Sequence, residues 1–154
     1  YFNMNLLNQS RRILLKSFGC CLSLPILSGK LFASWPEEAF MSTEIDKAIG
    51  ELYGHPPQAS DLVKLKVPDI AENGAVVPIS VSTDIENVES ISIYVEGNPN
   101  PLAATFELSP YIVAAVSTRI KMGKTSNVVA AVYSGGTVYT ATQEVKVTIG
   151  GCGG

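Results

Sequence analysis

The feature that most constrains the fold is an alternation of apolar and polar residues with period two, which runs with interruptions from residue 62 to residue 149. Such alternation is typical of strands that bury one face. Turn residues divide the stretch, at Glu72-Asn73-Gly74, at Gly97-Asn98-Pro99-Asn100-Pro101 and at Ser134-Gly135-Gly136. We therefore expect strands at 62–67, 75–82, 88–96, 103–108, 111–122, 127–133 and 137–149.

About seven short strands with turns every 8–12 residues predict an all-β fold, an immunoglobulin-like antiparallel β-sandwich. Pro78 has no N–H to donate, so its strand is expected to be an edge strand or to carry a bulge. Apolar residues of the later strands are expected in the core or at an interface, with the core favoured for most of them: Ile112, Val116, Val128 and Val132.

One short N-terminal helix is expected before the strands. Ser42-Thr43-Glu44 supplies a hydroxyl cap and an acid for the first turn, and Gly54 ends the helix before His55-Pro56-Pro57 breaks the chain. Apolar residues follow at helical spacing, at Ile45, Ala48, Ile49 and Leu52. Residues 34–41 are interpreted as the leader of the mature domain, pinned by Trp35 and Phe40.

The N-terminal 33 residues have the pattern of an export signal. Arg11 and Arg12 precede an apolar run over 17–27, which is too short to span a bilayer. The paired arginines resemble a twin-arginine signal, with a Sec-type or membrane-anchoring signal as the alternative. The prediction is a signal at 1–33, a domain at 34–149 and an arm at 150–154, and a protein exported to the periplasm already folded. Cys20 and Cys21 fall in the signal.

Removing the signal makes the protein more acidic. Residues 1–33 hold four of the 11 basic side chains and none of the 14 acidic ones, so the remainder carries a net charge of about −7. An acidic domain is not expected to bind nucleic acid, and no other stretch is long and apolar enough for a transmembrane helix. The single His55 suggests neither a metal site nor a catalytic triad, so we expect no cofactor.

The chain ends in Gly150-Gly151-Cys152-Gly153-Gly154, in which Cys152 is the only cysteine outside the signal. Glycines pack poorly and order at high entropic cost, so we expect a flexible arm that presents a thiol. No base or helix N-terminus accompanies the thiol, and an unactivated cysteine is a poor nucleophile at neutral pH. The arrangement favours a carrier over a self-sufficient enzyme. A frayed terminus without function is the alternative.

The sequence resembles the SoxY family, the sulfur-carrier subunits of the periplasmic thiosulfate-oxidising (Sox) system. Four segments carry the resemblance, namely residues 67–74 (VPDIAENG), 97–101 (GNPNP), 116–119 (VSTR) and 144–154 (EVKVTIGGCGG). The last of these is the most specific, and the twin-arginine signal agrees with it.

The resemblance implies a chemistry and a set of partners. Cys152 would hold the intermediates of thiosulfate oxidation while Gly150, Gly151, Gly153 and Gly154 form the arm around it. The chain would pair with a SoxZ-like subunit as a heterodimer. The enzymes that act on it would be a haem c thiosulfate-linking enzyme, a sulfate thiohydrolase and a sulfane dehydrogenase, so that this chain is itself no enzyme.

Two other functions remain open at this point. One is an exported structural or interaction β-sandwich whose Cys152 forms an intermolecular disulfide, because exposed thiols couple readily in oxidising compartments. The other is a C-terminal thiocarboxylate sulfur donor, in which the terminal Gly154 carboxyl is the functional group and Cys152 is incidental.

Overall fold

Two helices and nine strands make up residues 36–148, the part of the chain that the computed structural model describes. The helices are α2 (Glu37–Met41) and α3 (Ile45–Tyr53). The strands are β1 (Pro57–Ala59), β2 (Val63–Lys66), β3 (Ile70–Ala71), β4 (Val77–Thr83), β5 (Val88–Val95), β6 (Leu102–Glu107), β7 (Ala115–Ile120), β8 (Ser126–Ser134) and β9 (Thr137–Val147).

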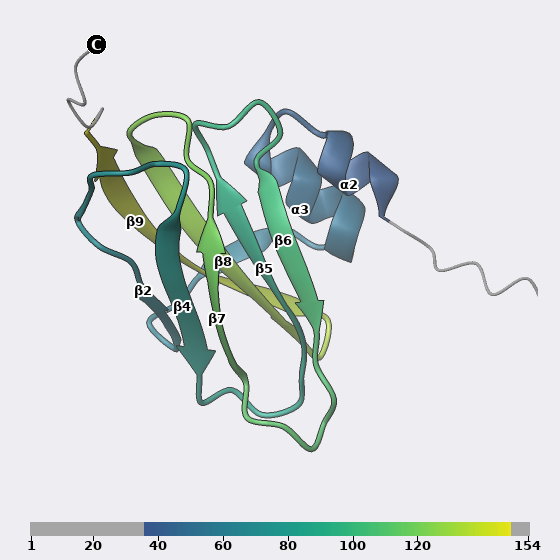
Figure 1. Ribbon diagram of the computed structural model, residues 1–154. Helices are drawn as coiled ribbons and strands as arrows, with labels where there is room; N and C mark the ends of the chain where they lie inside the picture. Colours follow the sequence, from purple (N-terminus) through teal and green to yellow (C-terminus); the bar gives the residue numbers. More distant parts are fainter. Residues whose placement is uncertain (1–35, 149–154) are drawn as a thin grey trace, which may run out of the picture. The chain divides into compact units, whose positions relative to one another are not determined.

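The strands form two facing sheets (Figure 1). The smaller sheet has the order β2-β4-β7, and the larger has the order β1-β9-β8-β5-β6 with β3 also paired to β9. The expected all-β sandwich is confirmed. Most pairs are antiparallel, but β1 and β3 both run parallel to β9. The chain thus leaves the larger sheet after β1, crosses to the smaller sheet as β2, and returns as β3.

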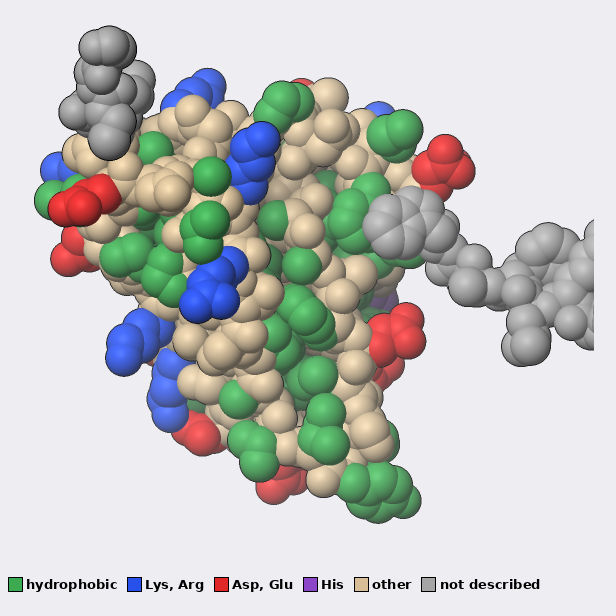
Figure 2. Space-filling model, in the orientation of Figure 1, with side chains coloured by type: hydrophobic (Ala, Val, Ile, Leu, Met, Phe, Trp, Pro, Cys, Tyr) green, Lys and Arg blue, Asp and Glu red, His purple; other side chains and the backbone are tan. Residues whose placement is uncertain are grey.

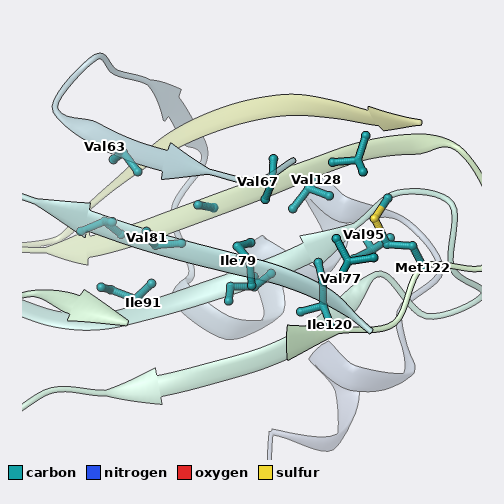
Figure 3. Packing of buried hydrophobic residues seen from close by; sticks show 14 of the residues in the cluster. Val63, Val67, Val77, Ile79, Val81, Ile91, Val95, Ile120, Met122 and Val128 are labelled. Atoms are coloured by element: carbon teal, nitrogen blue, oxygen red, sulfur yellow. The ribbon is translucent and has the colours of Figure 1, made fainter. Parts of the chain in front are cut away.

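The main core lies between the two sheets (Figure 3). Ile79 and Val81 of β4 face Ile91 and Ile93 of β5, and all four side chains are buried. Every second residue of β4 is buried, as the period-two pattern predicts. Strand β5 instead buries every residue except Glu89, and β8 buries its central residues 128–132, because these parts of the larger sheet are covered on both faces.

The helices cover the other face of the larger sheet and add a third layer (Figure 1). Ala48 and Ile49 of α3 are buried against Tyr94 and Val138, and Phe40 of α2 packs on the same cluster. Tyr53 is hydrogen-bonded to Ser92 on β5, and Ser92 donates in turn to Thr105 on β6 at 2.9 Å. The alternation in 88–96 thus sorts aliphatic residues toward the small sheet and hydroxyls toward α3.

The start of the chain departs from the prediction of a single helix. Residues 37–41, interpreted as a leader, form α2, and α3 begins at Ile45 after an N-cap at Glu44 that makes no side-chain capping bond. The expected hydroxyl cap is wrong because Ser42 closes the preceding helix, donating from Oγ to the carbonyl of Glu38 at 3.0 Å. The predicted end is confirmed, since Gly54 is left-handed with φ of 69°.

Two strand predictions also need correction. Pro78 lies in β4, the central strand of its sheet, but its neighbour β2 pairs only as far as Ser80, so no ladder bond to β2 is lost. The segment 111–122 becomes a strand only at Ala115. Ile112 is therefore exposed rather than core, whereas Val128 and Val132 are fully buried and Val116 packs at the core margin.

The hairpin turn at Ser134-Gly135-Gly136 is confirmed. Ser134 pairs with Thr137, and Gly135 and Gly136 have φ of 55° and 79°. Two consecutive positive φ angles match the right-handed twist of the flanking strands and are costly for residues with a side chain. This turn aligns the whole of β8 with β9 as far as Val145.

A buried tyrosine makes stability depend on alkaline pH. Burial raises the pKa of Tyr94 well above its ordinary value of 10.0. The unfolded chain therefore loses this proton first, and stability that is complete below about pH 10 falls as the pH rises further. We expect Tyr94→Phe to reduce the fall in unfolding free energy between pH 8 and pH 11 by about 1 kcal/mol, measured by urea titration.

The matched control is Tyr111→Phe, which removes the same hydroxyl from an exposed side chain. An equal fall in wild type and Tyr94→Phe would show that Tyr94 does not contribute to the pH dependence.

Candidate functional site

The residues predicted to form the site lie outside the described residues. This holds for Gly150, Gly151, Cys152, Gly153 and Gly154, and for Arg11 and Arg12 of the predicted signal at 1–33. The structure does describe the strand that leads to Cys152, up to Thr148. We call residues 145–148, at the end of β9, the arm root.

One edge of the arm root is held by β3. Ile70 and Ala71 run parallel to Lys146 and Val147. The N–H of Lys146 donates to the carbonyl of Asp69 at 2.9 Å, and that of Thr148 donates to Ala71 at 3.0 Å. Gln143 adds a side-chain bond from Nε2 to Oδ1 of Asp69 at 3.1 Å. The backbone is therefore fixed as far as the last described residue.

The opposite edge of the arm root is held by the first residue of β8 and by the residue before it. Ser126 pairs with Val145, and the next bond comes from a side chain, since the N–H of Val147 donates to Oγ1 of Thr125 at 2.9 Å. Val145 is fully buried in the main core. The arm root is thus bonded on both edges and anchored below by an apolar side chain.

Gly74 packs closely against the arm root and against Met122. Its carbonyl accepts from the N–H of Met122 at 2.7 Å. A Cβ at this position would overlap the carbonyl oxygen of Met122 and lie 2.8 Å from Cγ1 of Val147. Only glycine fits here without displacing the chain that carries the arm.

A further loop braces the same region. Asn98 donates from Nδ2 to the carbonyl of Lys121 at 2.8 Å and accepts from the N–H of Gly123 at 3.1 Å. Gly97 packs directly against Ser126, because a Cβ there would lie 2.7 Å from its Oγ. Three of the segments that carry the resemblance (67–74, 97–101 and the described part of 144–154) therefore meet around the arm root.

That convergence could not be read from the sequence. The turn signals located Gly74 and Asn98 in loops but gave no reason to place either loop beside residue 147. One hint was present in the sequence, because Gly74 and Gly97 each stand next to a predicted strand. Glycine in such a place often marks a close approach of another backbone segment.

The part of the chain that the structure describes was searched for metal ligands as well. Within 36–148, no group of three or more His, Cys, Asp or Glu residues is placed to hold a metal ion. His55 lies in the loop after α3, with its ring stacked toward Tyr133 at a centroid distance of 6.2 Å. Neither α2 nor α3 is long and apolar enough to cross a membrane.

Comparison with known proteins identifies the family to which the chain belongs. A family model described as "Sulfur oxidation protein SoxY" matches residues 49–152. The chain belongs to the SoxY family. The structure of the sulfur carrier protein SoxY from Chlorobium limicola f thiosulfatophilum is 45% identical, with a TM-score of 0.62, and the alignment covers 68% of this chain and 96% of that one. The predicted family is thus confirmed.

More distant structures share the sandwich alone. A superoxide reductase (neelaredoxin) from Ignicoccus hospitalis is 22% identical over 56% of this chain and 80% of its own, with a TM-score of 0.51. A variant of that reductase is 21% identical over 64% of this chain and 97% of its own, with a TM-score of 0.53. A search of curated proteins gave no match.

A substitution at Gly74 tests whether close packing there holds the arm root in place. Gly74→Ala should lower the unfolding free energy by about 1–3 kcal/mol, because the added methyl group displaces Met122 and Val147. Hydrogen exchange at the Thr148 amide should accelerate more than exchange in the hairpin at 134–137, because the clash lies beside the arm root.

The control is Gly50→Ala in α3, where a Cβ meets nothing within 4 Å. It should leave Thr148 exchange unchanged and stabilise the chain by up to about 1 kcal/mol. Equal Thr148 protection in wild type and Gly74→Ala would contradict the proposed role of Gly74.

Proposed function

We propose that this chain is the sulfur carrier of a thiosulfate-oxidising system and holds the intermediates on the thiol of Cys152. One observation carries the proposal: the SoxY family match extends to residue 152, so it includes the cysteine of the terminal motif. The solved relative at 45% identity is itself named a sulfur carrier protein.

The geometry of the arm root supports a carrier. Cys152 comes four residues after Thr148, and at about 3.3 Å per residue its Cα atom reaches at most about 13 Å from that of Thr148. A rigid root with a short glycine-rich extension presents a thiol at a defined place. The four glycines put no side chain beside that thiol, so a narrow enzyme pocket can admit it.

The proposed chemistry is a series of oxidation and hydrolysis steps on sulfur attached to Cys152. Thiosulfate and the Cys152 thiol join through a new S–S bond, releasing a proton and an electron pair to a haem c–containing partner enzyme. Water then cleaves the terminal sulfone sulfur as sulfate, which leaves a persulfide on Cys152. A sulfane dehydrogenase would oxidise that outer sulfur to a sulfonate, with three oxygen atoms from water and six electrons passed to the dehydrogenase, and a second hydrolysis would then release sulfate and regenerate the thiol. Transfer of the outer sulfur to an acceptor would instead regenerate the thiol directly. The redox steps belong to the partners, and this chain contributes the attachment atom.

The proposed partners and location follow from the family and the signal. A SoxZ-like subunit would form the heterodimer, and the linking enzyme, the thiohydrolase and the dehydrogenase would act on the arm in turn. Arg11 and Arg12 would direct export of the folded chain to the periplasm by the twin-arginine route.

The decisive experiment is intact-mass spectrometry of the heterodimer after incubation with thiosulfate and the linking enzyme. We expect a reductant-sensitive gain of about 112 Da on Cys152, and a residual gain of about 32 Da after the thiohydrolase acts. Cys152→Ser should show neither. An adduct at the Gly154 carboxyl would indicate a thiocarboxylate donor, and a bare thiol in the complete system would exclude the carrier role.

The glycines of the arm provide a second prediction. Gly151→Val should slow loading by about tenfold or more, because a branched side chain beside Cys152 obstructs the enzyme pocket and misplaces the thiol. Gly50→Ala, remote from the arm, is the control and should load at the wild-type rate. Wild-type loading by Gly151→Val would show that the arm's narrow profile is unimportant.

A further inference from the structure

We propose that the loop between β6 and β7 is the docking surface for the partner subunit of the heterodimer. Its central residues Tyr111, Ile112 and Val113, which we call the distal patch, are 96%, 55% and 82% exposed. Consecutive large apolar side chains held in water are typical of protein–protein contacts. The identity of the partner rests on the proposed function, whereas the existence of the surface does not.

The distal patch lies at the end of the sandwich opposite the arm root. The N–H of Thr83 at the end of β4 donates to the carbonyl of Ala114, and Val88 at the start of β5 pairs with Ser134 at the hairpin turn. These elements begin or end where β9 begins, while the arm root lies at the other end of β9. Figure 2 shows hydrophobic side chains gathered at this lower end, over the loops seen at the bottom of Figure 1.

This position favours a permanent subunit over an enzyme as the occupant. Cys152 reaches only about 13 Å from Thr148, so an enzyme that acts on the thiol must contact the arm end of the sandwich. A subunit that stays bound through every step must leave that end free. The distal patch is the exposed apolar surface that meets this requirement.

A hollow beside the patch indicates the charge of the partner. It has a volume of about 370 Å³ and lies between residues 83–88 and the loop residues Ser109, Pro110, Ile112 and Ala114. Asp84 and Glu86 line it, and Asp84 is already paired with Lys64. The left-handed turn at Asn87, with φ of 53°, and bonds from Ser134 Oγ to the carbonyls of Glu86 and Asn87 fix its wall.

The hollow therefore fits a lysine or arginine from the partner, with its aliphatic stem against Ile112 and its charge toward Glu86. A second copy of this chain is a poorer occupant. A two-fold contact through the same patch would bring two acidic hollows into one interface with no lysine or arginine lining either of them, and an excess of like charge in an interface opposes association.

The strands on either side of the loop extend the surface. β6 and β7 each end their sheet, so each has one edge that no described strand covers. Unpaired strand edges are sites where another chain can add by backbone hydrogen bonds. A partner seated on the distal patch would also cover the start of β7 at Ala115.

Binding to the SoxZ subunit of the same organism tests the proposal, measured by calorimetry with the full chain. Tyr111→Ser/Val113→Ser should weaken binding by about tenfold or more, because exposed aromatic and apolar anchors dominate such contacts. The matched control is Ile70→Ser/Val76→Ser, which removes apolar side chains that are 58% and 50% exposed at the arm end. It should bind within about twofold of wild type.

A charge substitution gives an independent readout. Glu86→Lys should weaken binding, and Glu51→Lys on the helix face should not, with thermal unfolding confirming that all variants fold. Wild-type affinity for Tyr111→Ser/Val113→Ser, or an equal loss for the arm-end control, would overturn the proposal. Sedimentation of the chain alone shows whether the patch instead binds a second copy, which would overturn it as well.

Failure of this inference is distinguishable from failure of the carrier function. If Cys152 gains the thiosulfate mass in a heterodimer that still forms with Tyr111→Ser/Val113→Ser, the carrier function stands and the docking surface is wrong. If the patch variant abolishes the heterodimer but wild-type Cys152 is never loaded, the docking surface stands and the carrier function is wrong.

Discussion

The rigidity of the arm root depends on the pairing of β9 along both of its edges. β8 holds one edge from Thr137 to Val145, and β1 and β3 hold two stretches of the other edge by parallel pairs. A last strand left open on one side would expose unpaired backbone groups and fray toward its end. Because β3 and Thr125 satisfy the backbone up to Thr148, rigidity continues to within four residues of Cys152.

This arrangement separates the mechanical part of the protein from its chemistry. The core between the sheets is aliphatic, and the polar contacts beneath α3 are hydroxyl pairs that attach the helix to the sheet. The described residues thus build a scaffold, and the arm follows directly from its most firmly held strand. In the proposed function the two ends of the sandwich would have different tasks: one would present the thiol to successive enzymes, and the other carries the exposed apolar loop proposed to bind a lasting partner.

Most of the strands were predictable because period-two alternation and turn residues are local properties. The hairpin at Gly135-Gly136 and the end of α3 at Gly54 were placed correctly, since each requires a backbone conformation that glycine adopts at low cost. The errors fall where tertiary contacts decide. Ser42 has the side chain of a helix start but ends α2, and Pro78 is accommodated in a central strand because β2 stops short of it. Strands β1 and β3 were missed because two or three residues beside prolines form no pattern of their own.

Local sequence was enough to predict the sandwich and the family, and it makes Cys152 the candidate reactive residue. The alternation is a property of adjacent residues. The terminal motif contains the single cysteine outside the predicted export signal, so it leaves no other candidate thiol there. The surroundings of the arm root, and the exposure of the apolar loop at the other end of the sandwich, became visible only in three dimensions. The reason is that β3, Gly74 and Thr125 meet β9 through contacts between distant parts of the chain, and such contacts have no local signature. The exposure of Tyr111 was equally undecided, because a run of apolar residues looks the same in a strand and in a loop until its neighbours are in place.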